Sequence, residues 1–553
     1  MKEETKSLYT AIILSVLIIF GVNRFFAPAQ KPQNASIEKK IELPQKTENE
    51  NKTEFFSTEE ALKLDDRVDI KTPDLKGSVR LKGARFDFAE LKKYKETLAP
   101  DSQDVTLLTP SQSSTPYFAE FGFLSMDKTL RLPDDRTLWT AYSKVLTPFR
   151  PLTLEWDNGK GLKFVRQISI DEHYLMTIND TVLNSSENIV TLYPFGRINR
   201  TVDEKYAASR SVVHEGITGV LDGTLKEFKL NDIKPESKKT FEAATAWAGF
   251  SDRYWFSAFI LNTDKQNTLN FSKTGERSYQ ADFTSSPIVI APNGTASTSV
   301  RFFVGAKEIK LLDKYTKQNG IKKFDLAVDF GWYYFLTKPF FYILDFLYKM
   351  IGNMGWAILL FAALLRLLMF PVASKSYDSM SKMRKIQPKV AALQVMYQND
   401  KLALQQKTME LYKKEKINPA AGCLPVLIQI PIFFSLYKVL NIAIEIRHAP
   451  FVGWIKDLSA PDPLTISVWS HIPLPSLLDI GVWPILMGLT MWIQQKLNPA
   501  PANKDQARMF AMMPFIFTLM LGHFASGLVI YWTLSNILSI MQQKAIMYKN
   551  GVK

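Results

Sequence analysis

The sequence has few of the residues that build catalytic, metal or disulfide sites. Among 553 residues there are five histidines and one cysteine, Cys423. A lone cysteine provides neither an internal disulfide framework nor a thiolate metal cluster. The chain contains no nucleotide-binding P-loop and no metal-ligand spacing. We therefore expect a protein that is not an enzyme, with no catalytic residues, no cofactor, no metal and no energy source of its own.

The charge balance favours a membrane surface as partner. Lys and Arg outnumber Asp and Glu by 68 to 54, and the formal net charge is +14. Such an excess suits nucleic acid or anionic lipid, but no zinc-finger spacing, aromatic RNA-binding motif or basic groove signature accompanies it. We therefore expect membrane lipids and not DNA. The mean hydropathy of −0.07 is an average over long apolar runs and charged stretches. We therefore expect separate domains, some in water and some in the bilayer.

The first apolar segment, Leu8 to Val22, has two interpretations. Its length suits a secretory signal, and the small residues at 27–29 resemble a cleavage site. The weak positive charge before it and Pro28 within that site favour an uncleaved transmembrane signal anchor over residues 1–29. Residues 30–60 are mostly polar, which predicts a flexible linker because such a segment buries too little apolar surface to order.

Residues 61–325 have the pattern of an all-β domain. Short runs with alternating apolar residues are separated by Asn, Asp, Gly and Pro turns. Examples are the runs 78–81, 85–88, 162–165 and 299–302. We predict a β-sandwich, and roughly 265 residues are enough for it to bury its own core.

Residues 326–553 predict a polytopic α-helical membrane core. An aromatic-rich segment interrupted by Lys338, Asp345 and Lys349 suits an interfacial helix. The predicted spans are about 350–370, 424–444, 482–495, 510–524 and 528–541. The last two are short, so local bilayer thinning is expected around them. With the N-terminal anchor, the chain would have six transmembrane helices.

The distribution of positive charge predicts the orientation. The segment 375–416 carries about ten basic and about four acidic residues, which places it in the cytoplasm by the positive-inside rule. Counting spans from it, the β-domain and the loop 445–481 are periplasmic, and the loop 496–508 and the C-terminus are cytoplasmic. A multi-pass protein of the bacterial inner membrane is expected.

Arg366 stands alone in an apolar run, and burying a cation there is costly. The apolar bodies of the five spans contain no Asp or Glu; the nearest acids are Glu445 and Asp479, at the periplasmic ends. One interpretation is that Arg366, close to Pro371, reaches the cytoplasmic headgroups. The other is a water-filled cavity in which Arg366 attracts the acidic or polar flank of a client.

Polar residues on the other spans suit either interhelical hydrogen bonds or a cavity wall. They are Gln429, Gln495, Thr518, Tyr531, Thr533 and Asn536. The segment of about 375–418 has apolar residues at threes and fours on both sides of a turn at 398–400, which predicts a helical hairpin. Its methionine-rich stripe indicates a packed seam first and a client or partner surface second.

Residues 330–543 resemble the YidC family of Gram-negative insertases. The matching segments include Met369-Phe370-Pro371 after Arg366, Lys382-Met383-Arg384, Gln387-Pro388-Lys389, Gly422-Cys423-Leu424-Pro425, Gln429-Ile430-Pro431, Pro484-Ile485-Leu486-Met487-Gly488, Met513-Pro514 and Gly527-Leu528-Val529-Ile530-Tyr531-Trp532. The resemblance covers the C-terminal 40% strongly. The β-region matches mainly by position, length and its ending Phe302-Phe303-Val304-Gly305.

The resemblance implies a periplasmic β-supersandwich similar to sugar mutarotases, an uncleaved first span and a five-helix core around a hydrophilic groove. The family's groove arginine corresponds to Arg366, and its groove-side aromatic pair corresponds to Tyr531 and Trp532. A threonine common in the family one turn before the arginine is Ala362 here, so client contact at that position is in doubt. The implied partners are client membrane proteins, the Sec translocon with its accessory subunits, the ribosome and the signal-recognition pathway.

Two other functions compete with a membrane protein insertase and chaperone. A secondary transporter would need an ion-coupling acid in the membrane and an internal repeat, and the sequence has neither. A membrane-tethered carbohydrate-active protein follows from the mutarotase-like fold alone, and a fold does not establish an activity.

Overall fold

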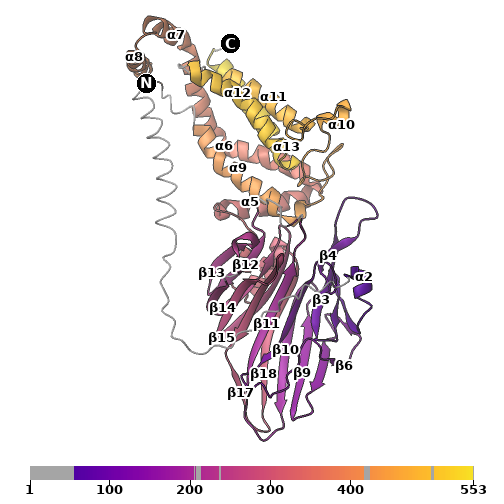
Figure 1. Cartoon of the computed structure of the whole chain (residues 1–553). Coiled ribbons are helices and arrows are strands. Elements are labelled where there is room, and N and C mark those ends of the chain that lie inside the picture. Colours follow the sequence, from indigo (N-terminus) through magenta and orange to yellow (C-terminus); the bar gives the residue numbers. More distant parts are fainter. Residues whose placement is uncertain are drawn as a thin grey trace. The chain divides into compact units, whose positions relative to one another are not determined.

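The computed structural model describes residues 55–204, 206, 213–235, 238–415, 417, 424–499 and 504–551. The predicted anchor over residues 1–29, nearly all of the predicted linker, and Cys423 lie outside the described residues. The described chain contains a sheet-rich region between Arg67 and Ala306, followed by a helical region (Figure 1).

The sheet-rich region has 18 named strands. They are β1 (Arg67–Lys71), β2 (Leu75–Arg80), β3 (Arg85–Lys95), β4 (Asp104–Leu108), β5 (Tyr117–Leu124), β6 (Thr140–Ala141), β7 (Val145–Leu146), β8 (Leu152–Asp157), β9 (Leu162–Ile170), β10 (Leu175–Asn184), β11 (Val190–Thr201), β12 (Gly216–Leu221), β13 (Thr224–Lys229), β14 (Lys239–Ser251), β15 (Trp255–Lys273), β16 (Ser278–Ser285), β17 (Ile288–Ile290) and β18 (Thr295–Ala306). The four alternating runs named above fall in β2, β3, β9 and β18, so the prediction of strands there is confirmed.

The long strand β15 belongs to two ladders. Its first part, from Trp255 to Ile260, pairs with β18, which continues through β10 and β9 (Figure 1) and then β8. Its last part, from Asn267 to Lys273, pairs with β16, which continues through β11, β5, β3, β2 and β1. Strand β14 runs along both parts and connects to β12 and β13.

Aromatic side chains join the two ladders. The ring centroid of Phe302 on β18 lies 5.6 Å from that of Phe86 on β3 and 5.7 Å from that of Phe121 on β5. All three are buried. Rings of this size remove a large apolar area from water and favour such tilted and edge-on contacts. The core of the β-region therefore lies between the ladders.

The helical region follows a short α4 (Ile309–Gln318) and the 3-10 turn η2 (Phe324–Ala327). Its helices are α5 (Tyr334–Ile351), α6 (Met354–Lys385), α7 (Gln387–Met396), α8 (Lys401–Lys414), α9 (Leu424–Ile442), α10 (Ile466–Ser470), α11 (Val482–Leu497), α12 (Lys504–Leu521) and α13 (Ser526–Lys549). The 3-10 turn η4 (Ile444–Ile446) lies between α9 and α10, and the short α2 (Thr58–Ala61) precedes β1. Gly352, at φ 77°, ends α5, and the Asn353 side chain caps the start of α6 by accepting from Trp356 N.

Two helical predictions need correction. The predicted span at 350–370 and the start of the predicted hairpin form one continuous helix, because α6 passes through Pro371 and ends at Lys385. Pro388 lies in the first turn of α7, where its ring fits a helix start and interrupts the preceding helix. The last two predicted spans are also longer as helices: α12 has 18 residues and α13 has 24. The spans were predicted from runs of apolar residues alone, and the helices continue into the polar residues on either side of those runs.

Of the helices in the described ranges, α6 alone has the length and apolar composition to cross a bilayer. Shorter apolar stretches lie at Leu427–Ile442 and Ala507–Leu521. The stretch of α6 that contains Arg366 has an exposed apolar face formed by Leu364, Leu367 and Leu368, on the side of the helix roughly opposite Arg366. This face has the character expected of a lipid contact.

Candidate functional site

Arg366 lies in the middle of α6 against α13. Its Nη2 donates a hydrogen bond to the backbone carbonyl of Ser535, with a distance of 3.2 Å between the two atoms. Its Nε is buried and has no hydrogen-bond partner among the described residues, and no described acidic side chain forms an ion pair with it. A buried donor without a partner carries a desolvation cost. The site therefore contains a cation whose hydrogen-bonding capacity is incompletely used.

Gln429 and Tyr531 bring two further helices to this site. Gln429 Nε2 on α9 donates to the hydroxyl oxygen of Tyr531 on α13, at 3.1 Å. Tyr531 is buried, and the charge of Arg366 acts on its hydroxyl group. Three of the six predicted site residues, from α6, α9 and α13, thus lie together.

The other three predicted site residues have different surroundings. Trp532 packs its ring 4.7 Å from Phe433 and 6.0 Å from Phe517 between centroids. The Thr518 hydroxyl donates to the Pro514 carbonyl one turn earlier, at 2.7 Å. It faces Gly488, where an added Cβ would come within 2.0 Å of that hydroxyl, so α11 and α12 approach closely there. Gln495 is partly exposed on α11.

A buried polar stripe on α13 extends beyond the predicted residues. Asn536 Nδ2 donates to Thr490 Oγ1 at 3.1 Å, and Gln542 Nε2 donates to Ser374 Oγ at 3.0 Å. Gln543 Nε2 donates to the Leu497 carbonyl at 3.2 Å. The buried polar side chains of this stripe are Thr533, Ser535, Asn536, Ser539, Gln542 and Gln543. Their spacing of threes and fours is visible in the sequence, but the predicted span ended at residue 541 and left out Gln542 and Gln543.

The hairpin stripe is divided between a packed part and an exposed part. Met380 is buried with Ala373 and Tyr377 against Ile546 of α13. Beyond the break at Ile386, apolar side chains on α7 and α8 are exposed, among them Val395, Met396, Leu402 and Met409. The first set is a seam between α6 and α13 and not a contact within the hairpin. The second set is an apolar surface without a described partner.

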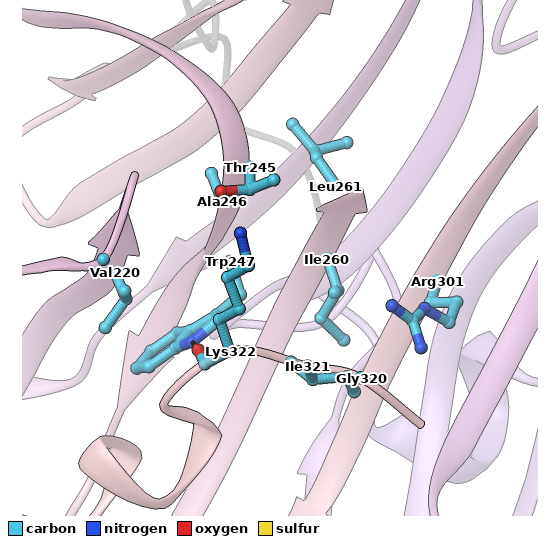
Figure 2. A pocket seen from close by; sticks show the side chains of 11 residues that line it. Val220, Thr245, Ala246, Trp247, Ile260, Leu261, Arg301, Gly320, Ile321 and Lys322 are labelled. Carbon is cyan, nitrogen blue, oxygen red and sulfur yellow. Dashed lines mark hydrogen bonds between the residues drawn. The ribbon is translucent and has the colours of Figure 1, made fainter. Parts of the chain in front are cut away.

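The β-region contains hollows that differ greatly in size. A cavity of about 20 Å³ lies beside Trp247, whose Nε1 donates to the Lys322 carbonyl at 3.0 Å (Figure 2). A water molecule needs at least about 10 to 15 Å³ measured in this way. The cavity is therefore too small for an organic ligand.

A larger hollow of about 520 Å³ is lined by Glu120, Arg197 and Trp139, among others. One oxygen of Glu120 accepts from Arg85 Nε at 2.9 Å, and the other accepts from Arg197. Both oxygens of this carboxylate are occupied by arginines, which makes it a poor general base for sugar chemistry. Among the described residues, no group of three or more His, Cys, Asp and Glu side chains could hold a metal ion.

The two histidines of the β-region also have structural partners. His173 Nδ1 lies 2.7 Å from an oxygen of Asp74, which also pairs with Lys93. The backbone nitrogen of His214 donates to Asp329, and burial lowers the pKa of the His214 ring. Neither histidine faces a nucleophile in the contacts described here.

Two family models cover most of the chain. The model of the YidC periplasmic domain matches residues 67–343, and the model of the 60Kd inner membrane protein matches residues 346–552. A protein of Beijerinckia indica named membrane protein insertase YidC is 45% identical, over 100% of this chain and 97% of its own length. A protein of the same name from Rickettsia bellii is 43% identical, over 98% of this chain and 99% of its own length.

Solved structures resemble the chain more distantly. The crystal structure of an active YidC insertase with its first transmembrane domain resolved is 17% identical, covers 86% of this chain and 91% of its own, and has a TM-score of 0.37. A galactose mutarotase-like protein from Lactobacillus casei is 8% identical, covers 43% of this chain and 100% of its own, and has a TM-score of 0.26.

Proposed function

This chain belongs to the YidC family of membrane protein insertases, and on that premise we propose that Arg366 receives the acidic or polar flank of a client segment. It is an inner-membrane protein with a periplasmic domain that inserts other membrane proteins. The proposed receiving site is a hydrophilic groove among α6, α9 and α13. The observation that carries the proposal is that Arg366 has no carboxylate partner among the described residues, where its printed contact is a backbone carbonyl and its Nε is buried without a hydrogen bond.

The strength of the attraction suits a transient contact. Two unit charges 4 Å apart attract by about 4 kcal/mol at an effective dielectric constant of about 20, and by about 1 kcal/mol in bulk water. The attraction to a client carboxylate would be stronger when the pair is shielded from water and weaker when the groove hydrates, and the desolvation of the carboxylate offsets part of the gain. The hydrogen bond from Arg366 to the Ser535 carbonyl and the hydrogen bond between Gln429 and Tyr531 would hold α6, α9 and α13 in an arrangement that leaves the site accessible to a client.

We propose that α6, α9, α11, α12 and α13 each cross the inner membrane and that residues 1–29 add a sixth span. The basic segment 375–416 supports a cytoplasmic α7–α8 hairpin, and the same rule places the C-terminus in the cytoplasm. Helix α11, with 16 residues, is about 24 Å long and is shorter than a hydrocarbon core of about 30 Å. Thinning of the bilayer at α11 would lower the barrier to a client.

The exposed apolar side chains of α7 and α8 support a role in partner contact. Val395 and Met396 lie next to the turn between the two helices, and the nearest lysines in the sequence are Lys389 and Lys401. Methionine-containing apolar surfaces adapt to varied partners. We assign this hairpin to contacts with the ribosome or the signal-recognition pathway, and the rest of the core to work alone or with the Sec translocon and its accessory subunits.

Charge variants at Arg366 test the electrostatic role. Arg366→Lys should retain most insertion, because the charge is kept. Arg366→Ala should reduce insertion of clients with acidic tails by about tenfold, which corresponds to about 1.4 kcal/mol. Arg366→Glu should be worse for acidic tails and milder for neutral ones. The measurement is client insertion in reconstituted vesicles with acidic, neutral and basic tails.

Arg384 provides a matched control. Its Nη1 also donates to a backbone carbonyl, that of Leu497, at 3.2 Å, but it lies outside the apolar run. Arg384→Ala should change insertion by a similar factor for all three tails. If every Arg366 variant also acts equally on all tails while folding normally, direct attraction is wrong and Arg366 instead maintains hydration or structure.

A further inference from the structure

A hollow of about 710 Å³ lies where β13, the segment after η2, α5 and α9 meet. Its size falls within the range of about 300 to 1,000 Å³ that is typical of ligand pockets. The groove around Arg366 does not include it, because its lining comes from residues 225–227, 326–337 and 434–438. It is the largest of the three hollows described here.

The hollow is lined by charges of both signs. Lys438 Nζ lies 2.6 Å from Asp329 Oδ2, and both side chains remain partly exposed. Glu227 adds a second carboxylate to the lining. The two acids and one base sum to a formal charge of −1, so a purely anionic ligand is disfavoured. A ligand that carries an ammonium group and a phosphate would pair with both signs.

Thr337 provides an unused hydrogen-bonding group in the lining. Its side chain is completely buried, and its Oγ1 has no hydrogen-bond partner in the described part of the chain. A buried hydroxyl without a partner is costly. An acceptor oxygen in the hollow would remove that cost.

Exposed aromatic side chains form part of the lining of the hollow. Trp332 is 74% exposed and Phe434 is 48% exposed, and Tyr334 lies at the same end of α5. Large aromatic side chains at the start of an interfacial helix favour the headgroup level of a bilayer. Their faces also attract ammonium groups. An occupant with acyl chains would extend them along this apolar rim.

We infer that this hollow binds the headgroup of a zwitterionic, amine-bearing phospholipid. The ammonium lies toward Glu227 and Asp329, and the phosphate oxygens accept from Lys438 Nζ and Thr337 Oγ1. This inference rests on the proposed position of α5 at the bilayer surface. It adds a lipid site that is separate from the client groove.

Lipid retention by the purified full-length chain tests the inference. The protein is equilibrated in detergent with equal amounts of phosphatidylethanolamine and phosphatidylglycerol, and retained lipids are counted by native mass spectrometry. The natural sequence should prefer phosphatidylethanolamine by about fivefold or more. Glu227→Gln should bring that ratio near one, and Lys438→Gln should reduce the retention of both lipids.

Two further variants keep the result interpretable. Thr337→Val preserves the side-chain shape and removes the hydroxyl, so it should lower phosphatidylethanolamine retention by about threefold without unfolding the chain. Lys349→Gln removes an exposed lysine at the other end of α5, outside the hollow, and should change nothing.

Several outcomes would overturn the inference. They are equal retention of the two lipids by the natural sequence, a preference for phosphatidylglycerol, or Lys438→Gln behaving like Lys349→Gln. Displacement of the lipid by an equal concentration of soluble glycerophosphoethanolamine would also overturn the lipid assignment. Retention is measured without a client, so its failure is distinguishable from failure of the Arg366 proposal.

Discussion

The β-region and the helical region treat buried arginines in opposite ways. Arg166, which is 1% exposed, donates from Nε and Nη2 to the two oxygens of Asp180, both at 2.7 Å. Arg200 forms a similar pair with Asp252, at 2.8 and 2.9 Å. Arg366 has a single described hydrogen bond, to a backbone carbonyl. The buried arginines Arg166 and Arg200 of the β-region each have a carboxylate partner, whereas Arg366 of the helical region has none among the described residues.

This difference distinguishes a charge that stabilises the fold from a charge that is available to bind a client. A bidentate arginine–carboxylate pair fixes two strands in one geometry and cannot accept a third charged group without breaking. An arginine that has no carboxylate partner can meet a passing one and release it. The contrast predicts that removing a partner in the β-region damages stability, and that adding one in the helical region damages activity.

Asp180→Ala should have the largest effect on stability, because it removes the carboxylate partner of a buried arginine in the β-region. It leaves Arg166 buried without its countercharge, which typically costs about 3 to 5 kcal/mol of unfolding free energy. Denaturant unfolding of the full chain followed by tryptophan fluorescence measures the change. The control is Asp69→Ala, whose exposed pair with Lys71 should contribute less than about 1 kcal/mol. Equal effects of the two variants would refute a special role for the buried pair.

Glu445, between α9 and α10, extends the comparison to a buried acid, because it forms no ion pair among the described residues. One of its carboxylate oxygens is buried with no partner among the described residues. The pKa of Glu445 is raised from its ordinary 4.5 to about 7, mainly by burial and also by the nearby acids Glu308 and Asp345, while a backbone hydrogen bond and Lys310 lower it in part. The folded state therefore holds the proton more tightly, so stability is lost as pH rises from about 4.5 through about 7.

Glu445→Gln should remove this pH dependence. The variant should melt like the natural sequence near pH 4.5 and should be more stable by about 1 to 3 kcal/mol at pH 8. Thermal melts of the full chain in detergent across this pH range measure the difference. A constant difference at every pH would show that Glu445 does not titrate in this window.

Gln429→Glu should have the smallest effect on stability and a clear effect on function. It supplies the helical region with the carboxylate it lacks, close to Tyr531 and Arg366. We expect the free energy of unfolding to increase by about 1 kcal/mol, because the new carboxylate would offset the cost of burying Arg366 without a countercharge. Insertion of acidic-tailed clients should fall by about tenfold, because the site is then occupied.

The control for this variant is Gln494→Glu, which adds an acid to α11 without joining the Arg366 contacts. It should leave the dependence on tail charge unchanged. Normal insertion of acidic tails by Gln429→Glu, together with an intact fold, would argue against a transient pairing at Arg366.

The sequence predicted features that depend on local periodicity. Alternation at 162–165 and 299–302 predicted strands β9 and β18, and the apolar runs predicted the positions of α9 and α11. Helix ends were less predictable, because helical hydrogen bonding continues where apolar residues stop. Lys385 thus belongs to α6 although it lies beyond the apolar run.

By itself, the sequence determined that Arg366 has no acidic neighbour in the apolar spans and that the chain belongs with insertases rather than with metal or nucleotide enzymes. Only the tertiary structure decided which polar residues meet. Gln429 and Tyr531, 102 residues apart, share a hydrogen bond, whereas Thr518 bonds to its own helix. Side-chain partners across helices depend on the rotation and crossing of whole helices, which packing sets over many residues and which no single run of sequence contains.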